Sequence, residues 1–308
     1  MKVWLGPRGT RDFLRDAVTA GGGFVVDGPD DVAGADAVVW TAPRDPEGLR
    51  AVLRKNPRVP WVQLPWAGIE HYLPVLDDQR VWTAGQGVYA RDVAEHALAL
   101  TLAGLRDLKR RALATSWQAP SGRSLHGAYV TILGAGGIAH ELVKLLVPFD
   151  VQLTIVRRRA HEPFAAALPA RVVSFQQRSE ALRDADVVVV ALALTPETSG
   201  CIGAVELAAM KETAWLINVA RGAHVNTDAL VAALRERRIG GAAVDVTDPE
   251  PLPDGHPLFT LDNAIVTPHC ANTPEMAVPV LTERVRENVR RRIAGEPLLG
   301  VVDVKAGY

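Results

Sequence analysis

The sequence has only two cysteines, Cys201 and Cys270, among its 308 residues. Two cysteines cannot build a disulfide framework, and their separation does not match the paired spacing of a zinc site. We therefore expect a protein of a reducing compartment, the cytoplasm, that holds no metal. Long apolar runs are missing too, since none approaches the roughly 20 residues of a membrane span. The first residues, MKVWLGPRGTRDF, lack the apolar core of a signal peptide, so neither export nor membrane insertion is predicted.

An excess of charge of either sign is also lacking. The chain has 34 lysines and arginines against 35 acidic residues, and its formal net charge is -1. Such a chain is not expected to bind nucleic acid or an anionic membrane. Against this neutral background the segment TIVRRRA (154–160) is informative, because it places Arg157, Arg158 and Arg159 side by side. This basic cluster predicts that a negatively charged group binds there.

Apolar residues are plentiful, at 48% of the chain, and the length suits two domains with sizeable cores. Short apolar runs of strand length alternate with helix-like stretches, which favours parallel βαβ units. We expect two series of strands and therefore two α/β sheets. The first series comprises 2–5, 37–40, 61–64 and 81–83, and the second comprises 128–133, 152–156, 186–192, 215–219, 242–246 and 264–267.

Two long helices are also predicted. Residues 92–113 are rich in alanine and leucine, which indicates a helix that connects the two domains. A second helix follows the last strand, because apolar residues recur there at i, i+4 spacing from Leu281 to Ile293 and Gly295 stands after them as a stop. Its arginines indicate a solvated face. This helix can return the chain to complete the first domain.

A glycine loop lies between a predicted strand and a predicted helix. Gly134, Gly136 and Ala139 have the spacing G-x-G-x-x-A, which is typical of dinucleotide-binding folds. Gly134 allows a tight turn, Gly136 lets the backbone approach a pyrophosphate, and Ala139 permits close packing of the helix on the strand. The helix start, with Gly137 and Ile138, presents free N–H groups and the positive end of the helix dipole. The segment predicts a dinucleotide site.

The three arginines follow the next strand, where NAD-binding folds carry an acid for the ribose 2′-hydroxyl about 20 residues beyond the glycines. Arg157 lies 21 residues after Gly136, and no acid occurs between Asp150 and Glu162. An acid would repel a 2′-phosphate, whereas arginine binds it through charge-assisted, bidentate hydrogen bonds. We therefore expect NADPH to be preferred, with NADH as an alternative, and at least one arginine to contact the 2′-phosphate while the others solvate the strand end.

Three later stretches make the interpretation specific: MKETAWLINVARGAHVNTDAL (210–230), GAAVDVTDPEPLP (241–253) and VTPHCANTPEM (266–276). Together they resemble the D-isomer-specific 2-hydroxyacid dehydrogenase family, and within it the short glyoxylate/hydroxypyruvate reductase-like members. Segments 64–73, 87–100, 122–139 and 192–203 are similar to family segments in family order. The resemblance covers most of the chain.

The resemblance implies three catalytic residues: Arg221 in NVARG, Glu250 five positions after the aspartate of VDV, and His269 in TPHC. Their chemistry suits the reduction of a 2-oxo acid. Arg221 can bind the substrate carboxylate and polarise the neighbouring carbonyl. His269 can act as the acid/base, because an unperturbed imidazole titrates near pH ~6.5, and an ionised Glu250 beside it would favour the imidazolium.

The resemblance also implies further ligand contacts. The loop WAGIE resembles the family segment whose backbone N–H groups bind the substrate carboxylate, which assigns Ala67 and Gly68 to the substrate, with Trp66 beside them. The remaining implied contacts are with the cofactor, and they are made by Thr195, Ala220 and Asp245. Of these, Asp245 matches a position near the nicotinamide amide.

For the architecture, the resemblance implies two Rossmann-like or flavodoxin-like α/β domains with parallel sheets and a cleft between them. A substrate domain would comprise residues 1–98 and 281–308, and a cofactor domain residues 99–280. Family members are commonly dimers, so we expect a homodimer that binds a small 2-oxo or 2-hydroxy acid.

Several alternatives stay open. The same chemistry could act on pyruvate, phenylpyruvate or a larger 2-oxo acid. The chain could also be a nucleotide-sensing binding protein, because the same fold family includes transcriptional corepressors. Formate oxidation is disfavoured, because the formate-oxidising branch of the family has a glutamine at the position that matches Glu250. Cys270 has no second activating partner in the sequence and is expected to be a small packed residue.

Overall fold

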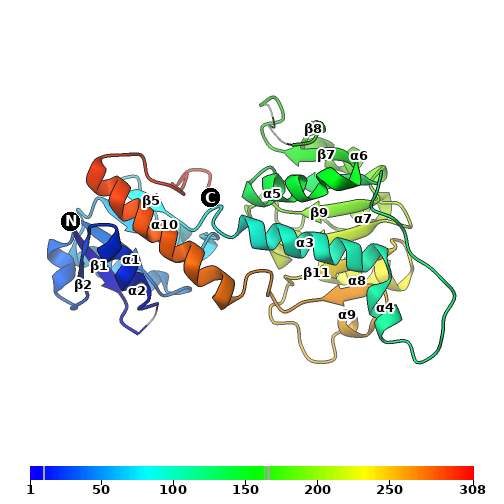
Figure 1. Ribbon diagram of the computed structural model, residues 1–308, viewed down its shortest axis with the longest axis horizontal. Coiled ribbons are helices and arrows are strands. Elements are labelled where there is room, and N and C mark those ends of the chain that lie inside the picture. The colour runs from blue at the N-terminus through cyan, green and yellow to red at the C-terminus, as the bar shows by residue number, and fades with distance from the viewer. Residues whose placement is uncertain (10, 163, 165–166) are drawn as a thin grey trace. The chain divides into compact units, whose positions relative to one another are not determined.

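The computed structural model of the chain describes residues 1–9, 11–162, 164 and 167–308. These residues divide into two units, which we call the first unit (Met1–Tyr89 with Thr273–Tyr308) and the second unit (Ala90–Asn272). In Figure 1 the first unit carries both the blue and the red ends of the chain, so it is discontinuous, whereas the second unit is one uninterrupted stretch. None of the described helices combines the length and apolar character that crossing a membrane requires.

The first unit is built on a parallel sheet with the strand order β2-β1-β3-β4-β5. Its described strands are β1 (Lys2–Gly6), β2 (Phe24–Val26), β3 (Ala37–Trp40), β4 (Trp61–Gln63) and β5 (Val81–Thr83). Its described helices are α1 (Leu14–Ala20), α2 (Pro46–Lys55) and α10 (Pro274–Ala294), with the short 3-10 helices η1 (Asp31–Gly34) and η2 (Glu70–Val75). The order is that of a flavodoxin-like sheet.

Helix α10 covers one face of the first sheet. Its residues Leu281, Val285 and Val289 are fully buried together with Val3 and Trp61. These are three of the four residues of the predicted i, i+4 stripe, and burying each such side chain contributes about 1.5–3 kcal/mol. The fourth, Ile293, is 51% exposed, so the buried stripe ends a turn earlier than predicted. Gly295 ends the helix with a φ of 70°, a left-handed conformation that favours glycine.

The second unit is built on a parallel sheet with the strand order β12-β11-β10-β9-β6-β7-β8. Its described strands are β6 (Tyr129–Leu133), β7 (Gln152–Arg157), β8 (Ala170–Ser174), β9 (Val187–Val190), β10 (Trp215–Asn218), β11 (Gly241–Val244) and β12 (Ala264–Val266). The strand order reverses between the neighbours β6 and β9. Strands β7 and β8 follow β6 on one side, and strands β10, β11 and β12 follow β9 on the other. Parallel sheets bind ligands beyond their carboxyl ends at this kind of reversal.

Helices cover both faces of the second sheet. Those described are α3 (Ala90–Leu105), α4 (Leu108–Ala112), α5 (Gly137–Leu146), α6 (Arg178–Arg183), α7 (Ala204–Ala209), α8 (Thr227–Arg235) and α9 (Pro257–Thr260), with the short 3-10 helices η3 (Val147–Phe149), η4 (Phe175–Gln177) and η5 (Gly222–His224). Helices α3 and α5 bury their apolar sides in one core. Helices α6, α7 and α8 contribute to the other. The prediction of two parallel α/β domains is confirmed.

The structure differs from the sequence-based expectation at two strands and one helix. Strands β2 and β8 were not among the expected strands, and both lie at sheet edges, where only one side is paired. The helix expected over 92–113 is broken into α3 and α4, because Asp107 adopts a left-handed backbone with a φ of 52°. The prediction of one continuous helix over this range is therefore wrong.

Candidate active site

The glycine loop joins strand β6 to helix α5. Gly134 has a φ of 119°, and a Cβ atom at this position would overlap the carbonyl oxygen of Ala191, so the turn requires glycine. Gly136 caps α5 in an extended conformation and has open space where a side chain would stand. Ala139 is fully buried against the sheet. Gly137 and Ile138 begin the helix, so the loop offers unobstructed N–H groups that fit a dinucleotide pyrophosphate.

The arginines stand at the end of β7, next to the glycine loop, since the N–H of Gly134 donates to the carbonyl of Val156. Arg157 and Arg159 both contact Glu162: Nη2 of Arg157 lies 2.9 Å from Oε2, and Nη1 of Arg159 lies 3.2 Å from Oε1. Arg158 lies between them on the chain. The basic cluster was located from the sequence, but its pairing with Glu162 was not predicted. A tight turn brings Glu162 back to the end of the strand.

The three predicted catalytic residues follow three neighbouring strands. Arg221 comes after β10, Glu250 after β11 and His269 after β12, and these strands are adjacent and parallel. Their carboxyl ends therefore share one edge of the sheet. Gly222, next to Arg221, lies so close to the carbonyl of Thr247 that it leaves no room for a Cβ atom. The two segments that lead to Arg221 and Glu250 are thus in direct contact.

His269 and Glu250 form a hydrogen-bonded pair. Nδ1 of His269 lies 2.8 Å from Oε1 of Glu250, and the two side chains are 48% and 32% exposed. His269 has a φ of 50°, and its backbone N–H donates to the carbonyl of Asp245 at 2.8 Å. Because Nδ1 is engaged by the carboxylate, Nε2 is the ring nitrogen that can exchange a proton with a ligand.

Arg221 is oriented by its own turn. Its Nη1 donates to the carbonyl of Ala220 at 2.7 Å, and its backbone N–H donates to Nδ1 of His224 at 3.2 Å. Ala220 is itself buried, and its N–H donates to Oδ1 of Asn218. The guanidinium is partly exposed, as binding a soluble anion requires.

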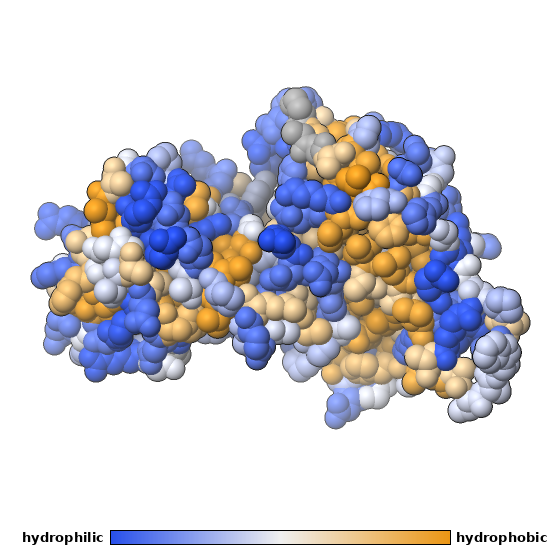
Figure 2. All heavy atoms as spheres, in the orientation of Figure 1, coloured by the Kyte–Doolittle hydropathy of each residue, from blue (hydrophilic) through white to orange (hydrophobic). Residues whose placement is uncertain are grey.

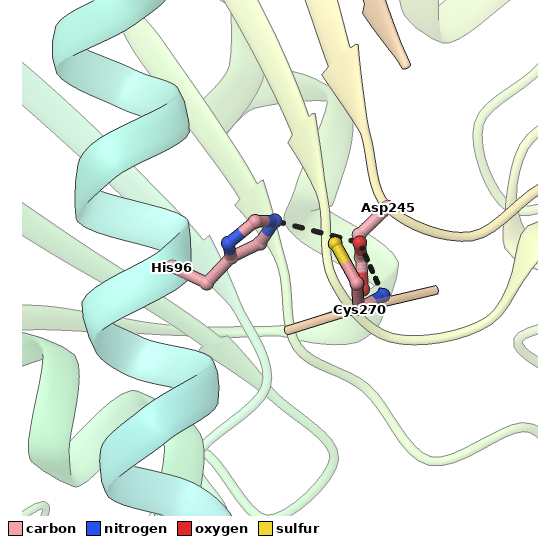
Figure 3. A group of neighbouring side chains, drawn as sticks. All are labelled: His96, Asp245 and Cys270. Carbon is pink, nitrogen blue, oxygen red and sulfur yellow. Dashed lines mark hydrogen bonds and ion pairs between the residues drawn. The ribbon is translucent and has the colours of Figure 1, made fainter. Parts of the chain in front are cut away.

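Asp245 is a buried anion held by several donors. Its Oδ1 accepts hydrogen bonds from Oγ1 of Thr267 at 2.6 Å and from the N–H of Cys270 at 2.9 Å, and its Oδ2 accepts from the N–H of Ala271 at 3.0 Å. Nε2 of His96, on α3, lies 3.4 Å from Oδ1 (Figure 3). Burial opposes ionisation, but the hydrogen bonds outweigh it and hold the pKa of Asp245 well below its usual range.

The close-up in Figure 3 groups His96, Asp245 and Cys270, whose polar atoms lie within 4.8 Å of one another. The hydrogen bonds already described account for this grouping. Burial and the charge of Asp245 raise the pKa of the Cys270 thiol, so it is expected to stay protonated and packed. His96 was not among the predicted residues; its signal is a polar residue among the buried alanines and leucines of α3.

Thr195 lies in a turn beyond β9. Its backbone N–H donates to Oγ1 of Thr198 at 2.9 Å, and its carbonyl accepts from the N–H of Ser199. The turn thus has a defined shape at the same carboxyl edge as the glycine loop, since β9 neighbours β6.

Trp66, Ala67 and Gly68 lie in the first unit, in the segment after β4, and all three are partly exposed. The guanidinium of Arg11 stands 3.8 Å above the centre of the Trp66 ring, and its Nη1 donates to the carbonyl of Pro65. Burial lowers the pKa of Arg11. This arginine places positive charge beside the loop expected to bind a carboxylate, and the sequence analysis did not identify it.

Comparison with known proteins identifies a family. Residues 76–271 match the model of the D-isomer specific 2-hydroxyacid dehydrogenase NAD binding domain. The glyoxylate/hydroxypyruvate reductase A of Photorhabdus laumondii subsp. laumondii is 32% identical over 269 residues, which are 85% of this chain and 79% of that protein. The human glyoxylate reductase/hydroxypyruvate reductase is 36% identical over 186 residues, which span 60% of this chain and only 56% of the human protein.

A solved structure extends the likeness to the whole fold. The D-isomer specific 2-hydroxyacid dehydrogenase of Xanthobacter autotrophicus Py2, solved in complex with NADPH and MES, has a TM-score of 0.83 at 27% identity. The match covers 100% of this chain and 99% of that one.

Proposed function

Because the chain belongs to the D-isomer specific 2-hydroxyacid dehydrogenase family, we propose that it reduces glyoxylate or hydroxypyruvate to the 2-hydroxy acid, the D-isomer where the product is chiral. Membership makes it an oxidoreductase that uses a nicotinamide cofactor and acts on small 2-oxo or 2-hydroxy acids. The choice of substrate is supported by two relatives that are named as reductases of glyoxylate and hydroxypyruvate.

The contact between Nδ1 of His269 and Oε1 of Glu250, 2.8 Å long at the carboxyl edge of the sheet, carries the mechanism. The bound cofactor supplies the hydride to the carbonyl carbon. Nε2 of His269 donates a proton to the carbonyl oxygen, and Glu250 fixes the ring and stabilises the imidazolium. Arg221 binds the substrate carboxylate and polarises the carbonyl.

The roles of the remaining predicted residues are part of this proposal. Asp245, Thr195 and Ala220 orient the cofactor, and the backbone of Ala67 and Gly68 binds the carboxylate, with Trp66 as an apolar wall. Arg11, stacked on Trp66, supports these substrate assignments, since it adds positive charge beside them.

Preference for NADPH is proposed from the basic strand end. Arg157 ends β7 and Arg159 follows it, beside the glycine loop, where a 2′-phosphate would meet both guanidinium groups and Arg158. The free thiols of Cys201 and Cys270 support a reducing compartment such as the cytoplasm.

A homodimer is proposed from exposed apolar residues of the second unit. Apolar side chains gather over the face that carries α3 and α5 (Figure 2). The segment directly after α3 adds three large exposed apolar side chains, Leu108, Leu113 and Trp117. A second copy of this chain would cover them. Light scattering after size exclusion should give twice the chain mass of 33.1 kDa, and a monomer at micromolar concentration would refute this assembly.

A steady-state matrix tests the proposed reaction. NADPH and NADH are each combined with glyoxylate, hydroxypyruvate, pyruvate and phenylpyruvate, and oxidation of the cofactor is followed. We expect the highest kcat/KM with NADPH and one of the first two acids. Highest turnover of pyruvate or phenylpyruvate would change the substrate, and comparable kcat/KM with both cofactors would remove the preference. NADPH binding without turnover of any acid would instead favour a nucleotide-sensing protein.

A further inference from the structure

We propose that Glu162 is a specificity-determining residue that competes with the 2′-phosphate of NADPH for Arg157 and Arg159. Its carboxylate would thereby set how strongly NADPH is preferred over NADH. This inference rests on the proposed placement of the 2′-phosphate at the end of β7.

The geometry shows one carboxylate between two guanidinium groups. Oε2 of Glu162 lies 2.9 Å from Nη2 of Arg157, and Oε1 lies 3.2 Å from Nη1 of Arg159. The Arg157 side chain is 16% exposed, whereas those of Arg159 and Glu162 are 59% and 37% exposed. The less exposed arginine thus already has a negative partner within the chain.

The local backbone presents Glu162 to these arginines. The N–H of Glu162 donates to the carbonyl of Arg159 at 3.1 Å, which folds the chain back toward the strand end. Nη1 of Arg157 also reaches the carbonyl of Glu162, at 3.5 Å. Phe164 stacks on His140 of α5, with ring centroids 4.4 Å apart, which holds the segment next to the cofactor helix.

A carboxylate and a phosphate use the same guanidinium N–H groups, so the two compete. The 2′-phosphate of NADPH carries more charge and can displace Glu162, but the displacement costs the existing ion pairs. NADH has a 2′-hydroxyl and leaves these pairs intact. Glu162 therefore weakens the binding of NADPH and leaves that of NADH unchanged.

Nucleotide fragments test the proposal without any turnover. The dissociation constants of 2′,5′-ADP and 5′-ADP are measured by calorimetry for the wild type, E162Q and the control E236Q. Glu236 also pairs with an arginine, Arg238, at 3.2 Å on an exposed part of the second unit. Since exposed ion pairs are weak, we expect E162Q to bind 2′,5′-ADP about three- to tenfold more tightly. Its affinity for 5′-ADP, and both affinities of E236Q, should stay within twofold of the wild type.

A double-mutant cycle separates this inference from the proposed cofactor preference. In an R157Q/R159Q background, the E162Q substitution should no longer strengthen the binding of 2′,5′-ADP. If E162Q binds 2′,5′-ADP no more tightly than the wild type does, while R159Q still weakens the binding, the role of Glu162 is overturned and the proposed 2′-phosphate site is not. If R157Q/R159Q binds 2′,5′-ADP as well as the wild type, the proposed 2′-phosphate site itself is wrong. Should E162Q fail to fold, E162A also removes the carboxylate, and the same gain in affinity is expected from it.

Discussion

Two histidine–carboxylate pairs found among the described residues of the second unit differ in what surrounds the carboxylate. His269 and Glu250 are 2.8 Å apart with side chains 48% and 32% exposed. His96 and Asp245 are 3.4 Å apart, and the Asp245 side chain is 1% exposed. Glu250 is reached by solvent, whereas Asp245 is enclosed by Thr267 and by the N–H groups of Cys270 and Ala271.

This difference is what the proposed reaction requires of the first pair, and it suits a structural role for the second. The half-exposed imidazole of His269 is open to solvent and to a ligand. A buried carboxylate with several donors stays ionised, since protonating it would leave those donors without an anion. The same two residue types are therefore proposed to transfer a proton in one place, while they hold the strand ends together in the other.

The largest expected effect is on the exposed pair. The substitution H269Q should lower kcat by about 10²–10⁴, because the proton donor is lost. The thermal midpoint should change by no more than about 2 °C, since the side chain is half exposed. Steady-state kinetics and a circular-dichroism melt check both. A variant that keeps more than a tenth of the wild-type kcat would show that another group protonates the substrate.

Replacing the partner of His269 should have a smaller effect. In a Ser-His-Asp triad, the comparable loss of a buried carboxylate costs ~10⁴ in kcat, and the exposure of Glu250 should reduce that for E250Q to roughly 10². The KM for the 2-oxo acid should stay within threefold, because Glu250 does not bind the substrate. A raised KM with unchanged kcat would instead place Glu250 among the substrate ligands.

The buried pair should respond in stability. The substitution D245N places an amide against the hydrogen-bond donors that face a carboxylate in the wild type. It should lower the free energy of unfolding by about 1–3 kcal/mol. Urea denaturation measures this, with E250Q as the matched control from the exposed pair. Equal stability of D245N and the wild type would erase the distinction between the two pairs.

The smallest effect is the pH dependence of that stability. The folded state lowers the pKa of Asp245 below the unfolded value of ~3.9. Asp245 therefore stabilises the fold fully above the unfolded value, and this contribution is lost as the pH falls toward the folded one. The difference in unfolding free energy between the wild type and D245N should be constant from about pH 7 to 5 and shrink below about pH 4. Urea denaturation at several pH values follows it, and a constant difference at pH 3.5 would contradict the assignment.

The central strands could be predicted from the sequence because they are buried on both faces. Strand β9 reads VVVV and β3 reads AVVW, and all their residues are buried. The edge strands β2 and β8 were missed, since their side chains are largely exposed or only partly buried and their runs are short or mixed. Patterns of apolar residues report burial, so these two little-buried strands gave no signal, whereas the more buried edge strands β5 and β12 did.

The convergence of the three predicted catalytic residues at one sheet edge could be anticipated from motif segments, since each follows a recognisable strand. The partners Glu162, His96 and Arg11 could not. Glu162 reaches Arg157 only because a turn folds the chain back, and His96 meets Asp245 across about 150 positions of sequence. Arg11 lies over Trp66, far along the chain. These contacts depend on how elements pack, which a single sequence does not encode locally.

The placement of α10 has a consequence for how the nascent chain folds. Residues 90–272 leave the ribosome as one stretch and can fold as soon as they emerge. The first 89 residues emerge earlier, but the sheet face around Val3 and Trp61 lacks its cover until the last helix has been translated. We expect chaperones to bind the nascent chain during this interval, and a stop codon before residue 274 to yield an aggregating product.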